Sequence, residues 1–159
     1  MAIYLQIEGI RGDATHAEHQ GWIRVEKVQF GAGRKMRNSV GATGNRLPTS
    51  TELCPVRIWK RMCAATPLLM SAGLGKGRGL SARLHLVETG SPGHTYLDIA
   101  LRDVLLAAHE IDTTDGGNTI EYLHLDCTRV EMRYTPTGSD NQPLPPMAAA
   151  YDLSTERQS

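Results

Sequence analysis

The chain lacks any run of about 18 apolar residues, the length that a membrane-spanning helix needs. It also lacks the basic segment and continuous apolar stretch of a secretory signal peptide, because the apolar residues of Ile3–Ile7 alternate with polar ones and are followed by Glu8. We therefore expect a protein that is made and folded in the cytoplasm and inserts into no membrane. If it leaves the cell, we expect an export route that removes no signal peptide.

Cysteine is scarce, and the three cysteines form no Cys-x-x-Cys pair. This pattern predicts free thiols, buried or half-buried, in a reducing compartment. His16 and His19 are spaced like two metal ligands, but zinc needs three or four ligands and no second pair at suitable spacing follows. We expect both histidines to lie in a solvated loop, and we expect no metal and no other cofactor.

Signatures of catalysis are absent as well. The glycine-rich segment 73–79 is no phosphate-binding loop, because Lys76 is not followed by Ser or Thr and the segment comes after a predicted helix instead of before one. We interpret it as a helix stop and a flexible turn. The remaining histidines lie on or beside predicted strands: His85, His94, His109 and His124. No Gly-x-Ser-x-Gly turn accompanies them, so we predict no enzyme.

Alternation of polar and apolar residues is the dominant pattern. It covers residues 3–8, 80–88 and 95–108 and is typical of half-buried strands. We predict a mainly β fold, a β-barrel of two packed antiparallel sheets with one short flanking α-helix, because closure removes exposed strand edges. A length of 159 residues predicts a single domain over 1–159, with a short C-terminal tail after residue 153.

Two predicted strands change the phase of their alternation by one residue. In 22–30 the change falls near Glu26–Lys27, and in 119–134, predicted as one long closing strand, it falls near Thr128–Arg129. A one-residue slip predicts a β-bulge at each place. A short apolar segment over 148–153 then returns beside the closing strand.

The region between these strands is less regular. Residues 31–50 are rich in Gly, Arg, Asn and Ser and predict an extended basic loop. Residues 51–59 predict a further strand, which Pro55 places at an edge or a bulge.

A short helix is predicted over 67–72, with Thr66 as its N-cap, Pro67 at its first position and Gly73 as its stop. A longer amphipathic helix that starts near Ile58 is the alternative, and Pro67 would interrupt it.

The net charge is zero, but charge is unevenly distributed. Residues 27–87 contain eleven Lys and Arg and one acidic residue, a net charge of +10. The rest of the chain contains six Lys and Arg and sixteen acidic residues, a net charge of −10. Such segregation can create opposed surface fields, which suit an acidic polymer or a second copy of the chain placed tail to head. A nucleic-acid-binding β-barrel that uses the basic middle segment is therefore the alternative function. The balanced overall charge and the acidic hairpin region argue against it.

Four stretches follow one another in a specific order along the chain. They are Ile3–Asp13 with the strand Ile23–Val25, the strand and Thr-Pro-Leu-Leu helix of Arg57–Gly73, the paired strands near 80–88 and 96–104, and Val130–Pro136 with Tyr151-Asp152-Leu153. Together they resemble the haemolysin-coregulated protein (Hcp) family, the tube subunits of bacterial type VI secretion. The chain differs from the family pattern at Cys63, where Asp is frequent, and in the positive charge of 31–50.

The resemblance implies a subunit that catalyses no reaction and assembles as a homohexamer. Its rings stack head-to-tail inside a contractile sheath and are capped by a VgrG-type spike protein. Effector proteins are carried in the lumen, and the tube is secreted by type VI secretion without a cleaved signal peptide. No nucleic acid takes part.

Combined with the charge pattern, this assembly leads to a hypothesis about contacts between subunits. A ring has two different faces, so rings stack by a heterologous contact that can propagate. We expect the basic loop on one face to meet acidic residues of the next ring. The candidate contacts are Arg34, Lys35, Met36, Arg37 and Arg46 on the loop and Asp112, Asp115 and Asp140 opposite. Ring closure is expected on strand faces, because the phase slips leave some strands with two partly apolar faces.

Overall fold

The computed structural model describes residues 1–37, 47–90, 93–155 and 157–158. In chain order the elements are β1 (Ala2–Ile7), a short 3-10 helix (Ala17–His19), β2 (Ile23–Val25), β3 (Lys27–Gln29), β4 (Ala32–Arg37), β5 (Leu47–Leu53), β6 (Val56–Arg61), α1 (Thr66–Leu74), β7 (Leu80–Val87), β8 (Thr95–Asp112), β9 (Ile120–Asp126), β10 (Arg129–Tyr134), β11 (Met147–Asp152) and β12 (Arg157–Gln158). The predicted mainly β class with one short α-helix is confirmed. In the described part of the chain, no helix has the length and apolar character needed to cross a membrane.

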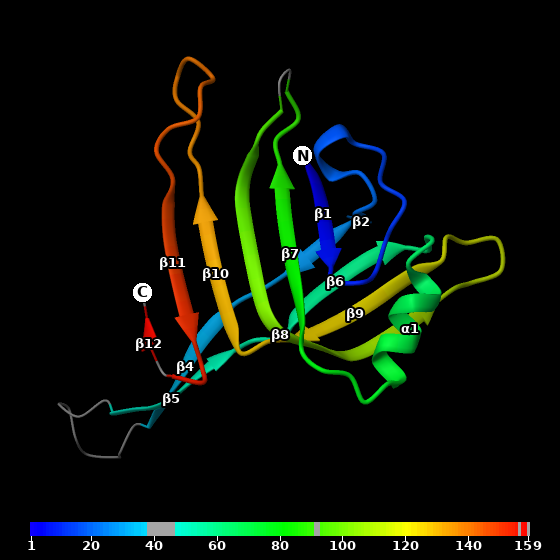
Figure 1. Cartoon of the computed structure of the whole chain (residues 1–159), viewed down its shortest axis with the longest axis horizontal. Coiled ribbons are helices and arrows are strands. Elements are labelled where there is room, and N and C mark those ends of the chain that lie inside the picture. The colour runs from blue at the N-terminus through cyan, green and yellow to red at the C-terminus, as the bar shows by residue number, and fades with distance from the viewer. Residues whose placement is uncertain (38–46, 91–92, 156, 159) are drawn as a thin grey trace.

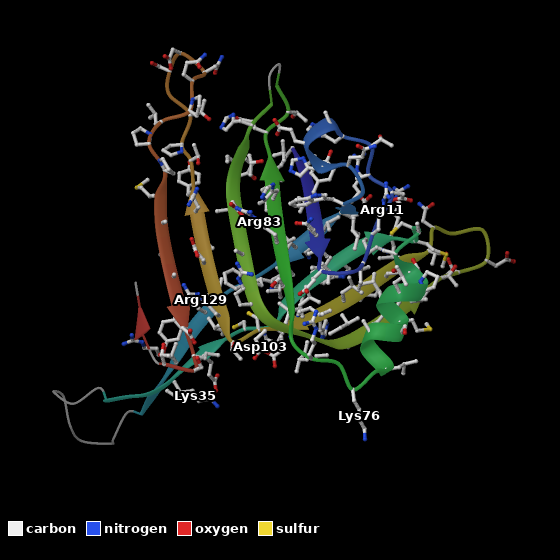
Figure 2. The ribbon with its side chains drawn as sticks, in the orientation of Figure 1. Arg11, Lys35, Lys76, Arg83, Asp103 and Arg129 are labelled. Atoms are coloured by element: carbon white, nitrogen blue, oxygen red, sulfur yellow. The ribbon has the colours of Figure 1, made fainter. Side chains whose placement is uncertain are left out.

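Two antiparallel sheets share the strand β8 (Figure 1). The first sheet has the order β12-β11-β10-β8-β7-β1-β2, and the second runs β3-β6-β9-β8. β8 is 18 residues long; its first half pairs with β7 and β10, and its second half, from Leu105, pairs with β9. Asp103, which has a φ of 53°, lies where the strand leaves one sheet for the other (Figure 2). The alternation over 95–108 had predicted this strand four residues too short.

The core lies between the inward faces of the two sheets. Its fully buried apolar side chains come from both sheets and from α1, and they include Leu5, Leu84, Leu101, Ile58, Leu123, Leu125 and Leu69. Each such side chain contributes about 1.5–3 kcal/mol when it is removed from water. Because Leu69 belongs to this cluster, α1 is fixed against the sheets by its inward face.

Both predicted bulges are places where the chain changes sheet. β2 pairs with β1 in the first sheet, and after Glu26 the chain continues as β3, which pairs with β6 in the second. Likewise β9 ends at Asp126 in the second sheet and β10 begins at Arg129 in the first. The prediction of one strand over 119–134 is therefore wrong. The phase slips because each sheet faces the core from the opposite side, so a strand that changes sheet must exchange its inward positions.

The predicted short helix is confirmed, and the longer alternative is wrong. α1 starts at Thr66, but its N-cap is Ala65, because the Thr66 hydroxyl is bonded elsewhere. The helix also includes Gly73 and runs to Leu74, and the N–H of Gly75 then donates to the Ser71 carbonyl at 3.0 Å. The stop therefore comes at the second glycine of the glycine-rich segment.

The predicted loop over 31–50 contains a β-hairpin instead. β4 and β5 pair with each other, and no other strand of the described chain pairs with either. The residues between them, 38–46, lie outside the described residues. The loop prediction failed because hydrogen bonds across the ladder stabilise a polar, glycine-rich sequence that carries no apolar alternation. The prediction of one strand over 51–59 is wrong, because β5 ends at Leu53 and β6 begins at Val56, with Pro55 between them. Proline lacks the N–H that a continuous ladder would need.

Candidate assembly surfaces

The β4–β5 hairpin stands off the body of the molecule, at the lower left of Figure 1. Arg34 and Lys35 are exposed on β4, and Figure 2 shows Lys35 at the hairpin. The Lys35 Nζ lies 2.8 Å from Glu52 Oε1 on β5, and this contact raises the pKa of Lys35. Two further predicted contacts, Met36 and Arg37, also lie on β4, and Arg46 lies outside the described residues.

The three candidate acids lie elsewhere on the surface, and all are exposed. Asp112 ends β8 and Asp115 follows in the turn to β9, at the right of Figure 1, whereas Asp140 lies in the loop between β10 and β11, at the top. The structure therefore does not bring the basic and acidic candidates together within one chain. In Figure 1 the Asp140 loop lies at the top and the hairpin at the lower left.

The charge segregation of the sequence is reduced by folding. Four cations of the basic segment each contact an acid from outside it: Lys60 with Glu121 (2.6 Å), Arg61 with Glu26 (3.2 Å), Arg78 with Glu8 (3.0 Å) and Arg83 with Asp98 (2.8 Å). Folding therefore pairs four of the eleven cations of the basic segment with acids of the other segment. The argument for a continuous basic surface, on which the nucleic-acid alternative depended, is weakened accordingly.

A buried ion pair lies under α1 and was missed by sequence reasoning. The side chains of Lys60 and Glu121 are both 0% exposed. Lys60 contacts Oε2 of Glu121, and His109 Nε2 lies 3.3 Å from the same oxygen. The Thr66 hydroxyl donates to the other oxygen, Oε1. Burial alone would raise the pKa of Glu121, but hydrogen bonds from Lys60 and Thr66 outweigh it and hold this pKa below its usual value. The network therefore fixes the first turn of α1 to β6, β8 and β9.

A signal for this pair was present in the alternation. Lys60 continues the inward positions Val56 and Ile58 of β6, and Glu121 shares the inward face of Leu123 on β9. Two opposite charges at inward positions of two strands predict a buried pair, provided that the strands are known to be neighbours.

A family model described as "Type VI secretion system effector, Hcp" matches residues 4–135. The chain belongs to the Hcp family. It is therefore a secreted tube subunit of type VI secretion and not an enzyme. A search of curated protein sequences found no significant match.

Solved structures agree with the Hcp fold. A structure titled "Structure of a type six secretion system protein" has a TM-score of 0.92 at 18% identity and covers 99% of both chains. The crystal structure of Hcp1 from Salmonella typhimurium has a TM-score of 0.80 at 17% identity, and the match covers 99% of this chain and 98% of the Hcp1 chain. The secreted protein Hcp3 from Pseudomonas aeruginosa has a TM-score of 0.63 at 15% identity, and the match covers 94% of this chain and 98% of the Hcp3 chain. At these identities the likeness shows the fold alone.

In this Hcp chain the expectation of a solvated histidine loop is wrong for His19, which is only 1% exposed. Its ring stacks on Tyr4 at 4.4 Å and meets Trp22 edge-on at 4.9 Å. Its Nδ1 lies 3.1 Å from His16 Nδ1, and its Nε2 lies 2.9 Å from His85 Nδ1. Burial, followed by the neighbouring His85 and His16, lowers the pKa of His19. Within the described ranges, no three His, Cys, Asp or Glu side chains are grouped so that they could hold a metal.

The cysteines of the Hcp chain differ in their surroundings. Cys127 is buried, and burial raises the pKa of its thiol to about 11. Cys63 is half-buried, as predicted, whereas Cys54 is exposed, so the prediction is wrong for that residue. Cys54 lies between β5 and β6, and its backbone N–H donates to the Gly31 carbonyl at 3.0 Å, next to the β4–β5 ladder.

Proposed function

We propose that this Hcp chain closes into homohexameric rings, that the rings stack head-to-tail, and that effector proteins are carried in the lumen. A VgrG-type spike and a contractile sheath are its further partners. In this proposal the chain folds as a single domain in the cytoplasm and is exported without a cleaved signal peptide. Membership of the Hcp family supports the assembly, and the hairpin supports the stacking contact.

The hairpin is the observation that carries the stacking proposal. A two-stranded hairpin is marginally stable by itself in water, and neither edge of this one is paired within the described chain. The hairpin, whose β4 carries Arg34, lies at the lower left of Figure 1, and the β10–β11 loop, which carries Asp140, lies at the top. Ring-to-ring contact would therefore bring the basic hairpin of one copy toward an acidic loop of the next. Each exposed ion pair contributes weakly, but a six-fold ring repeats it six times.

The position of Asp140 makes it the preferred partner among the three candidate acids. Asp112 and Asp115 lie on the flank that carries the β8–β9 turn, away from the end at which Asp140 lies. In this proposal Asp112 and Asp115 reach the hairpin of the next ring only if one ring is rotated about the tube axis relative to the other. Met36 and Arg37 remain candidate contacts on β4, and Arg46, outside the described residues, remains a candidate from the sequence alone.

Reversing charge on the hairpin tests this proposal. The double variant Arg34→Glu/Arg37→Glu leaves the Lys35–Glu52 pair of the hairpin in place. We expect it to form rings that no longer stack, as seen by negative-stain electron microscopy and sedimentation. The control Arg11→Glu/Arg24→Glu makes the same change in net charge at two exposed positions on other elements. It should stack like the wild type.

The outcomes separate the parts of the proposal. If the wild type forms no six-fold rings, the ring itself is refuted. If the hairpin variant stacks as well as the control, the rings stand but the hairpin has no role in stacking.

A further inference from the structure

The large apolar side chains that stay exposed fall mainly in two groups. In the described part of the chain, the first group lies on α1, just before it, or on the second half of β8: Met62, Leu68, Met70, Leu74, Leu105 and Ile111. The second lies at the end of β10 and along the approach to β11: Tyr134, Leu144 and Met147. A large exposed apolar surface marks a place of contact with another molecule. We call the two surfaces the helix patch and the edge patch.

The helix patch surrounds a groove. A depression of about 730 Å³ lies between α1 and β8 and is lined mostly by apolar atoms, with Leu68 and Leu105 both about half exposed at 46% and 49%. The sequence of α1, TPLLMSAGL, contains no charged side chain. A helix that carries no charge on its outer face is usually buried on that face too. Its inward face is already filled by Leu69, so the outer face lacks a cover in the single chain.

The edge patch is an open strand edge. β12 pairs only with Tyr151 and Asp152 of β11, so 147–150 has no strand on its outer side within the described residues. Natural edge strands are normally protected by Lys, Pro or a bulge. Pro145 and Pro146 stand just before β11, but Met147 and the three alanines after it include none of these. Tyr134 lies opposite Met147 across the β10–β11 ladder, so the two side chains belong to one surface.

The two patches lie on opposite flanks of the molecule. In Figure 1, α1 lies on the right and β11 on the left. A contact between two different surfaces of identical copies is heterologous, and it closes into a ring when its rotation is a whole fraction of a turn. The charges also match, since the groove is lined by Lys76 and Arg78 with one acid, Asp126, and the loop that holds Leu144 carries one acid, Asp140, and no base. Asp140 is also the acid of the proposed stacking contact, so the lateral contact depends mainly on the apolar side chains.

We propose that the edge patch of one copy, through Leu144 and Met147, packs into the α1–β8 groove of the next copy and so closes the ring. The partner is a second copy of this chain. This inference rests on the ring of the proposed function and assigns its lateral contact. The sequence led to the more general expectation that strand faces close the ring. In the present proposal, the edge of β11 and the loop before it fill the groove of the next copy instead.

A charge placed in either patch should open the ring. Leu105→Glu puts a carboxylate in the groove, and Met147→Glu puts one on the edge. Both positions are exposed in the single chain, at 49% and 63%, so folding should be unaffected. In the assembled ring the carboxylate would be buried without a partner. By native mass spectrometry we expect six-chain rings for the wild type and single chains for each variant. Gln6→Glu, at an exposed position of β1, is the control and should form rings.

Mixing the two variants gives the sharper test. The Leu105→Glu chain keeps an intact edge, and the Met147→Glu chain keeps an intact groove. An equal mixture therefore has one usable junction, and we expect a two-chain species containing one chain of each kind and nothing larger. Circular dichroism of each variant checks that it is folded. If either variant fails that check, Leu68→Glu and Leu144→Glu probe the same two surfaces.

Each result bears on a different part of the proposal. Rings in the wild type and in both variants would overturn the assigned contact and leave the proposed function standing. Single chains that form no mixed dimer would show that the two patches do not bind each other. A wild type without rings would overturn the proposed function first.

Discussion

Replacing Glu121 with Gln should destabilise the chain strongly, because it leaves the ammonium of Lys60 in the core without a counter-charge. Both side chains are 0% exposed, and the Lys60 Nζ lies 2.6 Å from Glu121 Oε2. Removing one member of a buried pair costs about 3–5 kcal/mol. For a chain of this length, 1 kcal/mol corresponds to about 2–4 °C in Tm, so we expect a fall of about 6–20 °C.

The double variant Lys60→Met/Glu121→Leu separates the cost of the unpaired charge from the value of the pair. It removes both charges and keeps apolar volume. Replacement of a whole buried pair is often neutral or stabilising. Thr66 loses its acceptor, which costs about 1 kcal/mol. We therefore expect the double variant to lie within about 2 kcal/mol of the wild type.

Urea unfolding at pH 7, followed by circular dichroism, measures both free energies. Assembly would stabilise the folded chain by mass action, so each variant is measured at two protein concentrations. A loss below about 1 kcal/mol for Glu121→Gln would refute the reasoning, since that is the scale of an ordinary hydrogen bond. So would a double variant as unstable as the single one.

Two further predictions concern other parts of the fold. Burial lowers the pKa of both His19 and His85, so the unfolded chain, whose histidines titrate near 6.5, binds more protons in mildly acidic solution. The free energy of unfolding should therefore be constant above this pH and fall below it, and urea titrations from about pH 8 to pH 5 should show a slope that His19→Phe reduces. A flat profile would contradict this. A Cβ on Gly12 would lie 2.7 Å from the Trp22 carbonyl carbon, so Gly12→Ala should cost about 1–3 kcal/mol. Gly33→Ala, with nothing within 4 Å, should cost less than about 0.5 kcal/mol, and equal melting temperatures of the two variants would argue against the close approach.

Local pattern was sufficient for the elements whose signals are local. Alternation located β1 and β7, the short apolar segment over 148–153 located β11, and the Thr66–Pro67 pair located the start of α1 to within one residue. Each of these signals lies within the strand or helix that it predicts, so the prediction did not depend on knowing which other elements pack against it.

Other features depend on distant partners. A one-residue phase slip is the same in sequence whether a strand bulges or changes sheet, and only the pairing of β3 with β6 decides it at Glu26. His19 is buried because Tyr4 and Trp22 enclose it, and β1, which carries Tyr4, is not adjacent in sequence. The groove was missed for the same reason, since α1 and β8 form it together.

β8 carries hydrogen bonds of both sheets on one unbroken stretch of backbone. A pulling or shearing load on one layer therefore reaches the other through covalent bonds at Asp103, and not only through side-chain packing between the layers. The two layers cannot slide apart while that strand is intact. For a secreted tube subunit, this continuity joins the two layers at a point where a sandwich of two separate sheets would have side-chain packing alone.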